Sequence, residues 1–268
     1  MTVVALLHPG AMGSRLGGEL VAAGHEVRWL AAGRSPASVV RAEREGLHPV
    51  GAVGALLDGA DTVLSVLPPQ FAVAVARLVS GAGFSGTYLD ANPLSPGTLE
   101  EVRQLATGAS AAFVDGGVVG PPPQHGSTGS TTNVYLAGET SSVDTVRDLF
   151  AGTGVTALVV GDRVGQASAA KQAYALYNKG RVVLAAAAAR LAAAHGVSNV
   201  LAAESSRRGA ELLSELDDVL SGLADVGWRW GPEFDQVAEA LADTGIDPSV
   251  ARALAADLHR FGSAPEPG

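Results

Sequence analysis

The sequence predicts an α/β domain with a mostly parallel, doubly wound sheet, followed by an all-helical domain. In the first 160 of 268 residues, short apolar runs alternate with amphipathic stretches, as expected when helices cover both faces of a parallel sheet. After Gly161 no strand-like run appears again, and Ala, Leu, Glu and Arg dominate. We therefore expect domains at residues 1–162 and 163–262, with a disordered, proline-rich tail at residues 263–268.

Seven apolar runs are expected to form strands, because most are too apolar to leave one face in water. They are Thr2–Leu7, Glu26–Leu30, Thr62–Leu67, Thr87–Asp90, Ala111–Asp115, Asn133–Ala137 and Val155–Val160. Helical patterns lie between them at Met12–Ala23, Pro36–Glu45, Phe71–Val79, Pro96–Ala106 and Val143–Phe150.

The second domain is expected to be opened by one long interdomain helix at Gly165–His195, about 30 residues or ~45 Å in length. Further helices are predicted at Asn199–Leu223, Pro232–Thr244 and Pro248–Phe261. The last two predictions rest on proline, which is favoured in the first turn of a helix.

The composition excludes several classes of function. The chain has no cysteine, which rules out disulfides, thiolate zinc sites and cysteine nucleophiles, and its six histidines lack metal-ligand spacing. A net charge of −9 argues against nucleic-acid binding. The most apolar stretch, Val182–Ala194, is shorter than the ~20 residues of a bilayer span, and Met1–Gly10 has no basic leader region. We expect a cytoplasmic protein without a metal site.

A glycine-rich turn, His8–Gly13, follows the first expected strand and opens a helix. Dinucleotide-binding folds place the pyrophosphate at such a helix N-terminus, which predicts a Rossmann-type domain. Gly10, with Ala11 and Met12, would let the backbone approach the phosphates, and Gly13 would allow close helix–strand packing. His8 occupies the place of the usual first glycine, so an ordinary glycine-rich turn is the alternative.

The end of the second expected strand predicts which nucleotide binds. An NAD site needs an acidic residue there for the ribose 2′-hydroxyl, but residues 30–35 contain no carboxylate. Arg34 offers a permanent positive charge that suits a 2′-phosphate, and Ser35 can bond the same group or cap the next helix. A solvated loop arginine is the alternative. The pattern favours NADP(H).

Four segments occur in a characteristic order: His8–Gly13, Leu67–Pro69, Asp115–Pro122 and Gly165–Lys171. With them the chain resembles the β-hydroxyacid dehydrogenase and 6-phosphogluconate dehydrogenase-like superfamily over nearly its whole length. It is most similar to a branch with a poorly characterised helical C-terminal domain, through Lys171–Ala175, Lys179–Gly180 and Arg229–Glu233.

The resemblance implies roles for residues at the cofactor. Leu67, Pro68 and Pro69 would lie along it, and Asn92 would lie near the nicotinamide. Both segments also follow apolar strands at their carboxyl ends, where open α/β sheets bind ligands. For Leu67–Pro69 the alternative is a stiff connection between strand and helix. For Asn92 the alternative is an ordinary turn residue.

Lys171 occupies the position of the family's general acid/base, early in the long helix. Tyr174 and Asn178 follow three and seven residues later, on the same helix face. Tyr174 is expected to act with Lys171 in proton transfer, and Asn178 to orient the substrate. Lys179 is rotated by about 80° from that face and is a second candidate. Without the resemblance, Lys171 would be an exposed helix charge and Tyr174 an interface residue.

The resemblance also places substrate contacts at Val119 and Gly120. Because Val119 has no hydroxyl and Pro121 has no backbone donor, a simple 3-hydroxycarboxylate is disfavoured as substrate and a bulkier or less anionic group is favoured. Trp230 and Glu233 are weaker substrate-side candidates. In related folds the helical domain pairs with its mate, so a homodimer is expected.

The leading hypothesis is an NADP(H)-dependent oxidoreductase that moves hydride between the nicotinamide and a small hydroxy or carbonyl substrate. An imine reductase or reductive aminase on the same scaffold is the first alternative. A non-catalytic NADP-binding sensor is the second. No nucleic-acid or membrane partner is expected.

Overall fold

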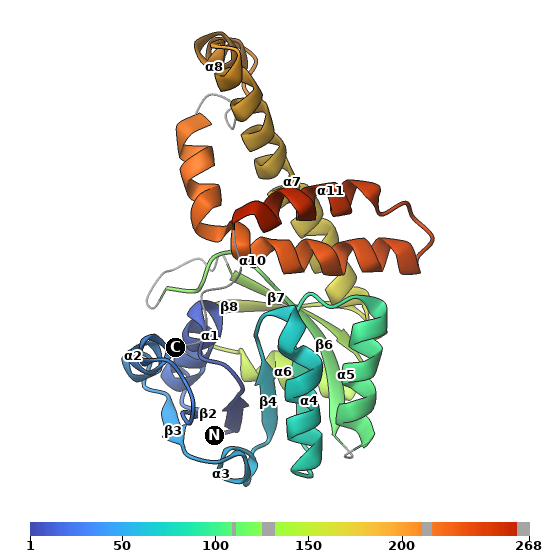
Figure 1. Ribbon diagram of the computed structural model, residues 1–268. Coiled ribbons are helices and arrows are strands. Elements are labelled where there is room, and N and C mark those ends of the chain that lie inside the picture. The colour runs from blue at the N-terminus through green and yellow to red at the C-terminus, as the bar shows by residue number, and fades with distance from the viewer. Residues whose placement is uncertain (109–110, 125–131, 211–215, 262–268) are drawn as a thin grey trace. The chain divides into compact units, whose positions relative to one another are not determined.

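The computed structural model describes residues 1–108, 111–124, 132–210 and 216–261 (Figure 1). The tail predicted at residues 263–268 lies outside them. The chain divides into two compact units, of which the first ends at Lys171 and the second begins at Gln172. This division follows contacts between residues, and the domain boundary expected after residue 162 stays a prediction.

The first unit contains an eight-stranded sheet with the order β3-β2-β1-β4-β5-β6-β7-β8. The strands are β1 Val3–Leu6, β2 Glu26–Leu30, β3 His48–Val50, β4 Thr62–Ser65, β5 Thr87–Asp90, β6 Ala112–Val119, β7 Thr132–Gly138 and β8 Val155–Gly161. Neighbouring strands from β3 through β6 are parallel, β6 and β7 are antiparallel, and β7 and β8 are parallel. The predicted α/β class and the mostly parallel sheet are confirmed.

Helices cover both faces of this sheet (Figure 1). One core contains residues of α1 Ala11–Ala22, α2 Pro36–Arg44 and α6 Thr140–Leu149. The other contains residues of α3 Val53–Leu57, α4 Ala72–Gly81 and α5 Pro96–Gly108, and a 3₁₀ turn, η1 Pro69–Phe71, precedes α4. Within β1, Val4 packs into the first core and Ala5 into the second, because successive strand residues face opposite sides. Two-sided burial explains the continuous apolar runs.

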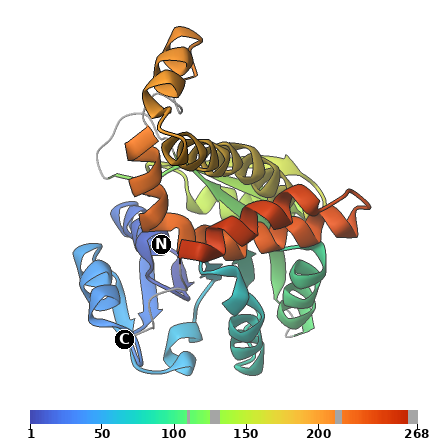
Figure 2. The same cartoon turned by 45° about the horizontal axis from the view of Figure 1, so that its top comes forward.

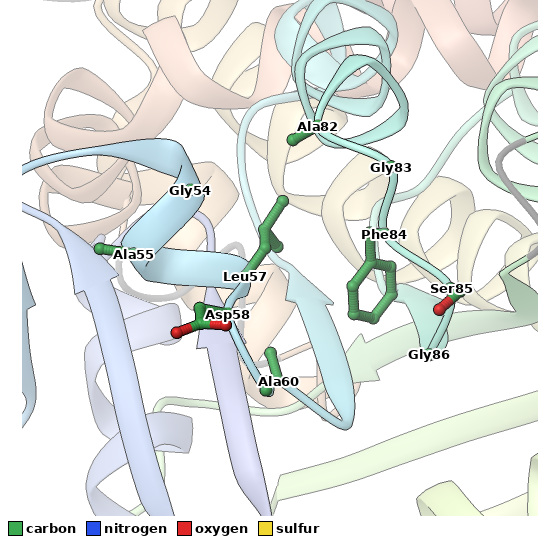
Figure 3. A pocket seen from close by; sticks show the side chains of 11 residues that line it. Gly54, Ala55, Leu57, Asp58, Ala60, Ala82, Gly83, Phe84, Ser85 and Gly86 are labelled. Atoms are coloured by element: carbon green, nitrogen blue, oxygen red, sulfur yellow. The ribbon is translucent and has the colours of Figure 1, made fainter.

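The amino edge of the sheet contains a hollow of about 510 Å³ (Figure 3). It is lined by the turns that precede β4 and β5, mainly by glycine and alanine. Leu57, Asp58, Phe84 and Ser85 supply its larger side chains. None of the residues predicted for cofactor or substrate lines it.

The second unit is helical, as predicted. It contains most of α7 Gln166–Ala194, then α8 Ser198–Arg207, α10 Leu216–Asp243, α11 Ser249–Leu258 and the 3₁₀ turn η2 His259–Phe261. Its core joins Val183 and Ala186 of α7 with Phe234 of α10 and Leu254 and Leu258 of α11. Among the residues that the structure describes, no helix combines the length and apolarity needed to cross a bilayer.

Two glycines on α10 permit close packing of the last turn of the described chain. Figure 2 shows α11 running beside α10. A Cβ at Gly227 would lie 2.8 Å from the Phe261 ring, and one at Gly231 would lie 2.7 Å from the His259 ring. Only glycine therefore fits at these two positions while η2 packs on α10.

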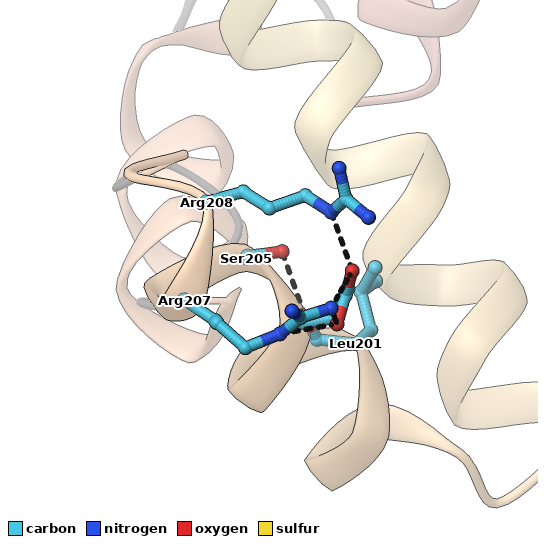
Figure 4. Close-up of polar contacts among 5 residues, drawn as sticks. Leu201, Ser205, Arg207 and Arg208 are labelled. Carbon is cyan, nitrogen blue, oxygen red and sulfur yellow. Dashed lines mark hydrogen bonds and ion pairs between the residues drawn. The ribbon is translucent and has the colours of Figure 1, made fainter.

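The last turn of α8 is held by local ion pairs (Figure 4). Glu204 pairs with Arg207 and Arg208 at 2.5 Å each, and the Ser205 hydroxyl donates to the Leu201 carbonyl at 2.7 Å. Pairs at three- and four-residue spacing on an exposed helix contribute a few tenths of a kcal/mol each, about 0.2–0.5. They stabilise the end of the helix.

Some predicted elements were wrong in extent. β3 and α3 were not predicted, and β6 continues beyond Asp115 to Val119. The helix expected at 199–223 is divided between α8 and α10, and α10 continues through Pro232 instead of starting there. Proline removes one helical hydrogen bond, but burial of Leu223 and Phe234 in one core holds α10 together on both sides of it.

Candidate functional site

The predicted cofactor residues meet at one edge of the sheet. His8 follows β1, Arg34 follows β2, Leu67 follows β4 and Asn92 follows β5. Because these strands are parallel, their carboxyl ends lie at the same edge. The neighbours β1 and β4 lead to connections in opposite directions, and such a switch point is where open α/β sheets bind ligands.

The glycine turn is built for a close approach between helix and strand. Gly10 is the N-cap of α1 and has extended backbone, and the Ser14 hydroxyl donates to its carbonyl at 2.8 Å. A Cβ at Gly13 would lie 2.3 Å from the His8 carbonyl oxygen, so only glycine fits there. The first N–H groups of α1 have no helical acceptor, which makes this end suited to an anion such as a diphosphate.

Two arginines contact this turn. Arg34 donates to the Leu7 carbonyl at 2.9 Å and lies 3.2 Å from Nδ1 of His8. Arg41 donates to the Pro9 carbonyl at 3.2 Å and to the Ser38 hydroxyl at 3.0 Å. Sequence reasoning missed Arg41 and Ser38, although their three-residue spacing on α2 indicates a shared helix face.

Ser35 has the capping role that the sequence left open. Its hydroxyl accepts from the Ser38 backbone N–H at 3.3 Å and lies 3.2 Å from the Ser38 hydroxyl. Pro36 is the first residue of α2, as expected. Two hydroxyls and two guanidinium groups therefore lie near the end of β2, where an NAD site would have a carboxylate.

His8 is neutral at physiological pH. Burial, followed by the charges of Arg34 and Arg41, lowers the pKa of His8 to about 4. Since a guanidinium only donates, the imidazole accepts from Arg34 at Nδ1 and has its proton on Nε2. A Cβ at Gly10 would lie 3.0 Å from the His8 ring. The His8 ring therefore packs against the backbone of Gly10 in the same turn.

Asn92 joins the ends of two strands. Its side-chain oxygen accepts from the Leu67 N–H at 2.7 Å, and its amide donates to Ser65 at 2.9 Å and to Asp90 at 3.1 Å. It is 1% exposed. The network fixes the start of Leu67–Pro69 at the sheet edge, while a contact with nicotinamide stays a prediction.

Asp90 is fully buried in this network. Burial raises the pKa of Asp90 to about 7, although hydrogen bonds from the backbone N–H and amide of Asn92 oppose the shift. Asp90 lies opposite Asp115 of β6 in register. Two buried carboxyl groups thus lie side by side at the carboxyl edge.

Asp115 is the second of these carboxyl groups, and it caps α7. Its Oδ2 accepts from the backbone N–H groups of Gly165, Ala167 and Ser168 at 2.9, 2.8 and 3.1 Å, and its Oδ1 accepts from the Ser168 hydroxyl at 2.6 Å. Burial raises the pKa of Asp115, and these four donors oppose the shift. Sequence reasoning named Asp115 only as the first residue of the Asp115–Pro122 segment, and this contact was missed.

Lys171 lies one turn further along α7. A Cβ at Gly117 of β6 would lie 2.8 Å from the Lys171 Cβ and 3.1 Å from the Ala167 carbonyl oxygen. The half-buried lysine is therefore seated directly on the strand backbone. Tyr174, which is 45% exposed, and Asn178 follow on the same face of the continuous helix.

The remaining predicted residues lie elsewhere. Val119 is the last residue of β6 and is buried, and Gly120 follows it with a φ of +111°, a conformation that favours glycine. In the helical unit, Glu233 forms an ion pair with Lys179, whose ammonium lies 5.1 Å from the Trp230 ring centroid. The structure thus brings Trp230 and Glu233, the two weaker substrate-side candidates, together with Lys179.

Lysine scarcity is a signal that sequence reasoning did not use. Of the 18 lysine and arginine residues in the chain, only Lys171 and Lys179 are lysines. Arginine does not lose its proton in proteins, whereas lysine can. Composition therefore sets Lys171 and Lys179 apart as the two side-chain amines of the chain.

Family comparison agrees with this geometry. Residues 4–161, more than half of the chain, match the family described as the NAD binding domain of 6-phosphogluconate dehydrogenase. The chain belongs to this family. Residues 192–261 match a second family, described as a domain of unknown function (DUF1932). The predicted superfamily and its branch with a poorly characterised helical domain are confirmed.

Solved structures show the same fold for this family member. It is 21% identical to Mycobacterium tuberculosis 3-hydroxyisobutyrate dehydrogenase with L-serine, with 97% and 94% of the chains covered and a TM-score of 0.74. It is 19% identical to a Streptomyces aurantiacus imine reductase (97% and 94%, TM-score 0.63). It is 17% identical to an Aspergillus terreus reductive aminase in complex with NADPH and ethyl levulinate (97% and 92%, 0.62). No curated protein is significantly similar in sequence.

Proposed function

We propose that this protein is an NADP(H)-dependent oxidoreductase that transfers hydride between the nicotinamide and a small hydroxy or carbonyl substrate. Lys171 would act as general acid/base. The observation that carries the proposal is that Lys171 packs on Gly117 of β6. This contact lies toward the carboxyl edge of the sheet, where the glycine turn opens α1. An amine fixed at a ligand-binding edge is suited to proton transfer.

The choice of NADP(H) over NAD(H) is supported by charge. Arg34 and Arg41 lie against the glycine turn, and Ser35 and Ser38 lie beside them. Residues 30–35 contain no carboxylate that would repel a 2′-phosphate. Each guanidinium already bonds a backbone carbonyl, which fixes its position before a nucleotide binds. Gly10, Ala11, Met12 and Gly13 would hold the diphosphate.

The bound cofactor would supply the hydride, and the chain would supply alignment and the proton. Asn92 holds Leu67, and with it Pro68 and Pro69, at the edge where the nicotinamide half would extend. In reduction, Lys171 Nζ would give a proton to the carbonyl oxygen; in oxidation it would take the proton of the hydroxyl group. Tyr174 would act with Lys171 in proton transfer. The substrate would be contacted by Asn178, Val119, Gly120, Trp230 and Glu233.

Imine reduction is the second candidate. The likeness to an imine reductase and to a reductive aminase covers nearly the whole chain, as does the likeness to a dehydrogenase. In that reaction Lys171 would protonate or orient the nitrogen instead of an oxygen. The buried Val119 and the donor-free Pro121 favour a less anionic substrate in either case.

The proposal includes a homodimer formed through the helical unit. Tyr177, Leu184 and Leu191 of α7 recur every seven residues and are 75%, 62% and 64% exposed. A long apolar stripe at this spacing is typical of a helix that pairs with another. Light scattering is expected to give twice the 26.9 kDa chain mass, and L184E with L191E is expected to give one chain. A monomeric wild type would refute the dimer.

Nucleotide titration followed by a substrate panel tests the function. NADPH is expected to bind at least tenfold more tightly than NADH, a difference of ~1.4 kcal/mol. Arg34→Ala should abolish this preference, and Arg77→Ala, which changes an exposed arginine paired with Glu101, should leave it unchanged. Turnover is then measured with alcohols, ketones and imines. NADPH binding without turnover of any of them would favour a sensor, and an unchanged preference in Arg34→Ala would overturn the nucleotide assignment.

A further inference from the structure

We propose that Asp115 is the positioning residue for Lys171: by holding the first turn of α7, it sets where the lysine amine lies along β6. The inference rests on the proposed role of Lys171. Asp115 itself does not touch substrate or cofactor in this assignment, because both of its oxygens accept hydrogen bonds from the helix.

The four hydrogen bonds restrict the helix in two ways. Three backbone donors, from Gly165, Ala167 and Ser168, meet one oxygen and fix the height of the first turn over the strand. The Ser168 hydroxyl meets the other oxygen at 2.6 Å and fixes the rotation of the helix about its axis. Lys171 is three residues after Ser168, so any rotation of this turn moves the lysine directly.

Gly117 provides the second point of attachment. Residues 115 and 117 face the same side of β6, since strand side chains alternate. A Cβ at Gly117 would lie 2.8 Å from the Lys171 Cβ, so the strand and the helix are in contact at the lysine itself. A clamp at Asp115 and a contact at Gly117 together fix residues 166–171, the start of α7, over the strand.

The clamp is strongest with a carboxylate. A carboxylate accepts at both oxygens, and its charge is favourable at the positive end of a helix. Asparagine at 115 could keep its oxygen on the backbone donors only by turning its NH₂ group to the Ser168 hydroxyl, which would then accept instead of donate. The charge at the helix end and the charge-assisted hydrogen bonds would be lost, although the size of the side chain would not change.

Asp90→Asn is a matched control for Asp115→Asn. Asp90 lies opposite Asp115 in the sheet and is equally buried, with 0% exposure for both residues. Asp90 accepts hydrogen bonds from Asn92, in the loop after β5, and from Ser65 of β4, whereas Asp115 accepts from the first turn of α7. A general effect of altering a buried carboxyl should therefore appear in both variants, and a specific effect on Lys171 in Asp115→Asn alone.

The two lysines allow a direct test. After reductive ¹³C-methylation, the side-chain signals come from Lys171 and Lys179 only, and Lys171→Arg and Lys179→Arg assign them. Asp115→Asn is expected to shift the Lys171 signal and to leave the Lys179 signal unchanged. Asp90→Asn should shift neither. Equal Lys171 signals in wild type and Asp115→Asn would overturn the proposal.

Kinetics on unmodified protein give a second measurement. Asp115→Asn is expected to lower kcat by up to about 10²-fold, the effect of a ~1 Å displacement of a reacting group, while the NADPH Kd stays within about twofold. Ser168→Ala removes one of four hydrogen bonds and should give a smaller loss of kcat in a stably folded chain. A loss in Asp115→Asn no larger than that in Asp90→Asn would contradict the assignment. Full turnover in Lys171→Met would refute the proposed function but not the positioning role of Asp115. The methyl signals test that positioning role independently of turnover.

Discussion

Lys171 and Lys179 carry the same amine on the same helix, but their surroundings differ. Lys171 lies over the backbone of β6, next to a turn that Asp115 caps. Lys179 contacts the carboxylate of Glu233 and the ring of Trp230 within the helical unit. In the first environment the β- and γ-carbons of Lys171 pack against Gly117. In the second, the charge of Lys179 contacts a carboxylate and an aromatic ring. The comparison supports the proposal that Lys171 serves in the chemistry, and it indicates that Lys179 contributes to packing.

The largest expected effect is on turnover at Lys171. Lys171→Met should lower kcat by about 10²–10⁴-fold, the usual contribution of general acid/base catalysis. Lys171→Arg should be equally impaired, because a guanidinium keeps the charge but does not exchange a proton at neutral pH. The rate of NADPH oxidation measures both variants. Full activity in Lys171→Arg would show that charge alone is required.

The buried carboxyl group of Asp90 should make stability depend on pH. Burial raises the pKa of Asp90 from 3.8 to about 7, so the native state binds a proton that the unfolded state releases. The protonated form stabilises the fold below about pH 4, and this contribution is lost as the pH rises through about 7. Between pH 4 and 8 the wild type should lose up to roughly 4 kcal/mol more than Asp90→Asn. Urea unfolding of both proteins measures the difference, and parallel curves would contradict it.

The smallest effect is expected at Lys179. Lys179→Met leaves the Glu233 carboxylate buried without its ion-pair partner, which should cost about 1–3 kcal/mol of the free energy of unfolding. Lys179→Met with Glu233→Gln should recover part of this loss, because the uncompensated charge is removed. Urea unfolding checks the cycle. A fall in kcat as large as that of Lys171→Met, without loss of stability, would reverse the comparison between the two lysines.

Much of the fold could be predicted from the sequence because its signals are local. The two-sided apolar runs predicted parallel strands, and β2 and β5 begin and end where expected. The glycine turn was located by its place after β1, and a Cβ at Gly13 would indeed meet the His8 carbonyl. β3 was not predicted, because it has three residues and contains Pro49, which disfavours a strand.

The sequence by itself determined the α/β class, the position of the cofactor turn, and, through the family resemblance, the choice of Lys171. Tertiary structure alone decided that Asp115 caps α7, fifty residues away along the chain, and that Arg41 contacts the turn at Pro9. Tertiary packing also decided that α10 continues through Pro232. Periodicity and local propensity record which face of a segment is buried, whereas a hydrogen bond between distant segments depends on how strands and helices come together in three dimensions.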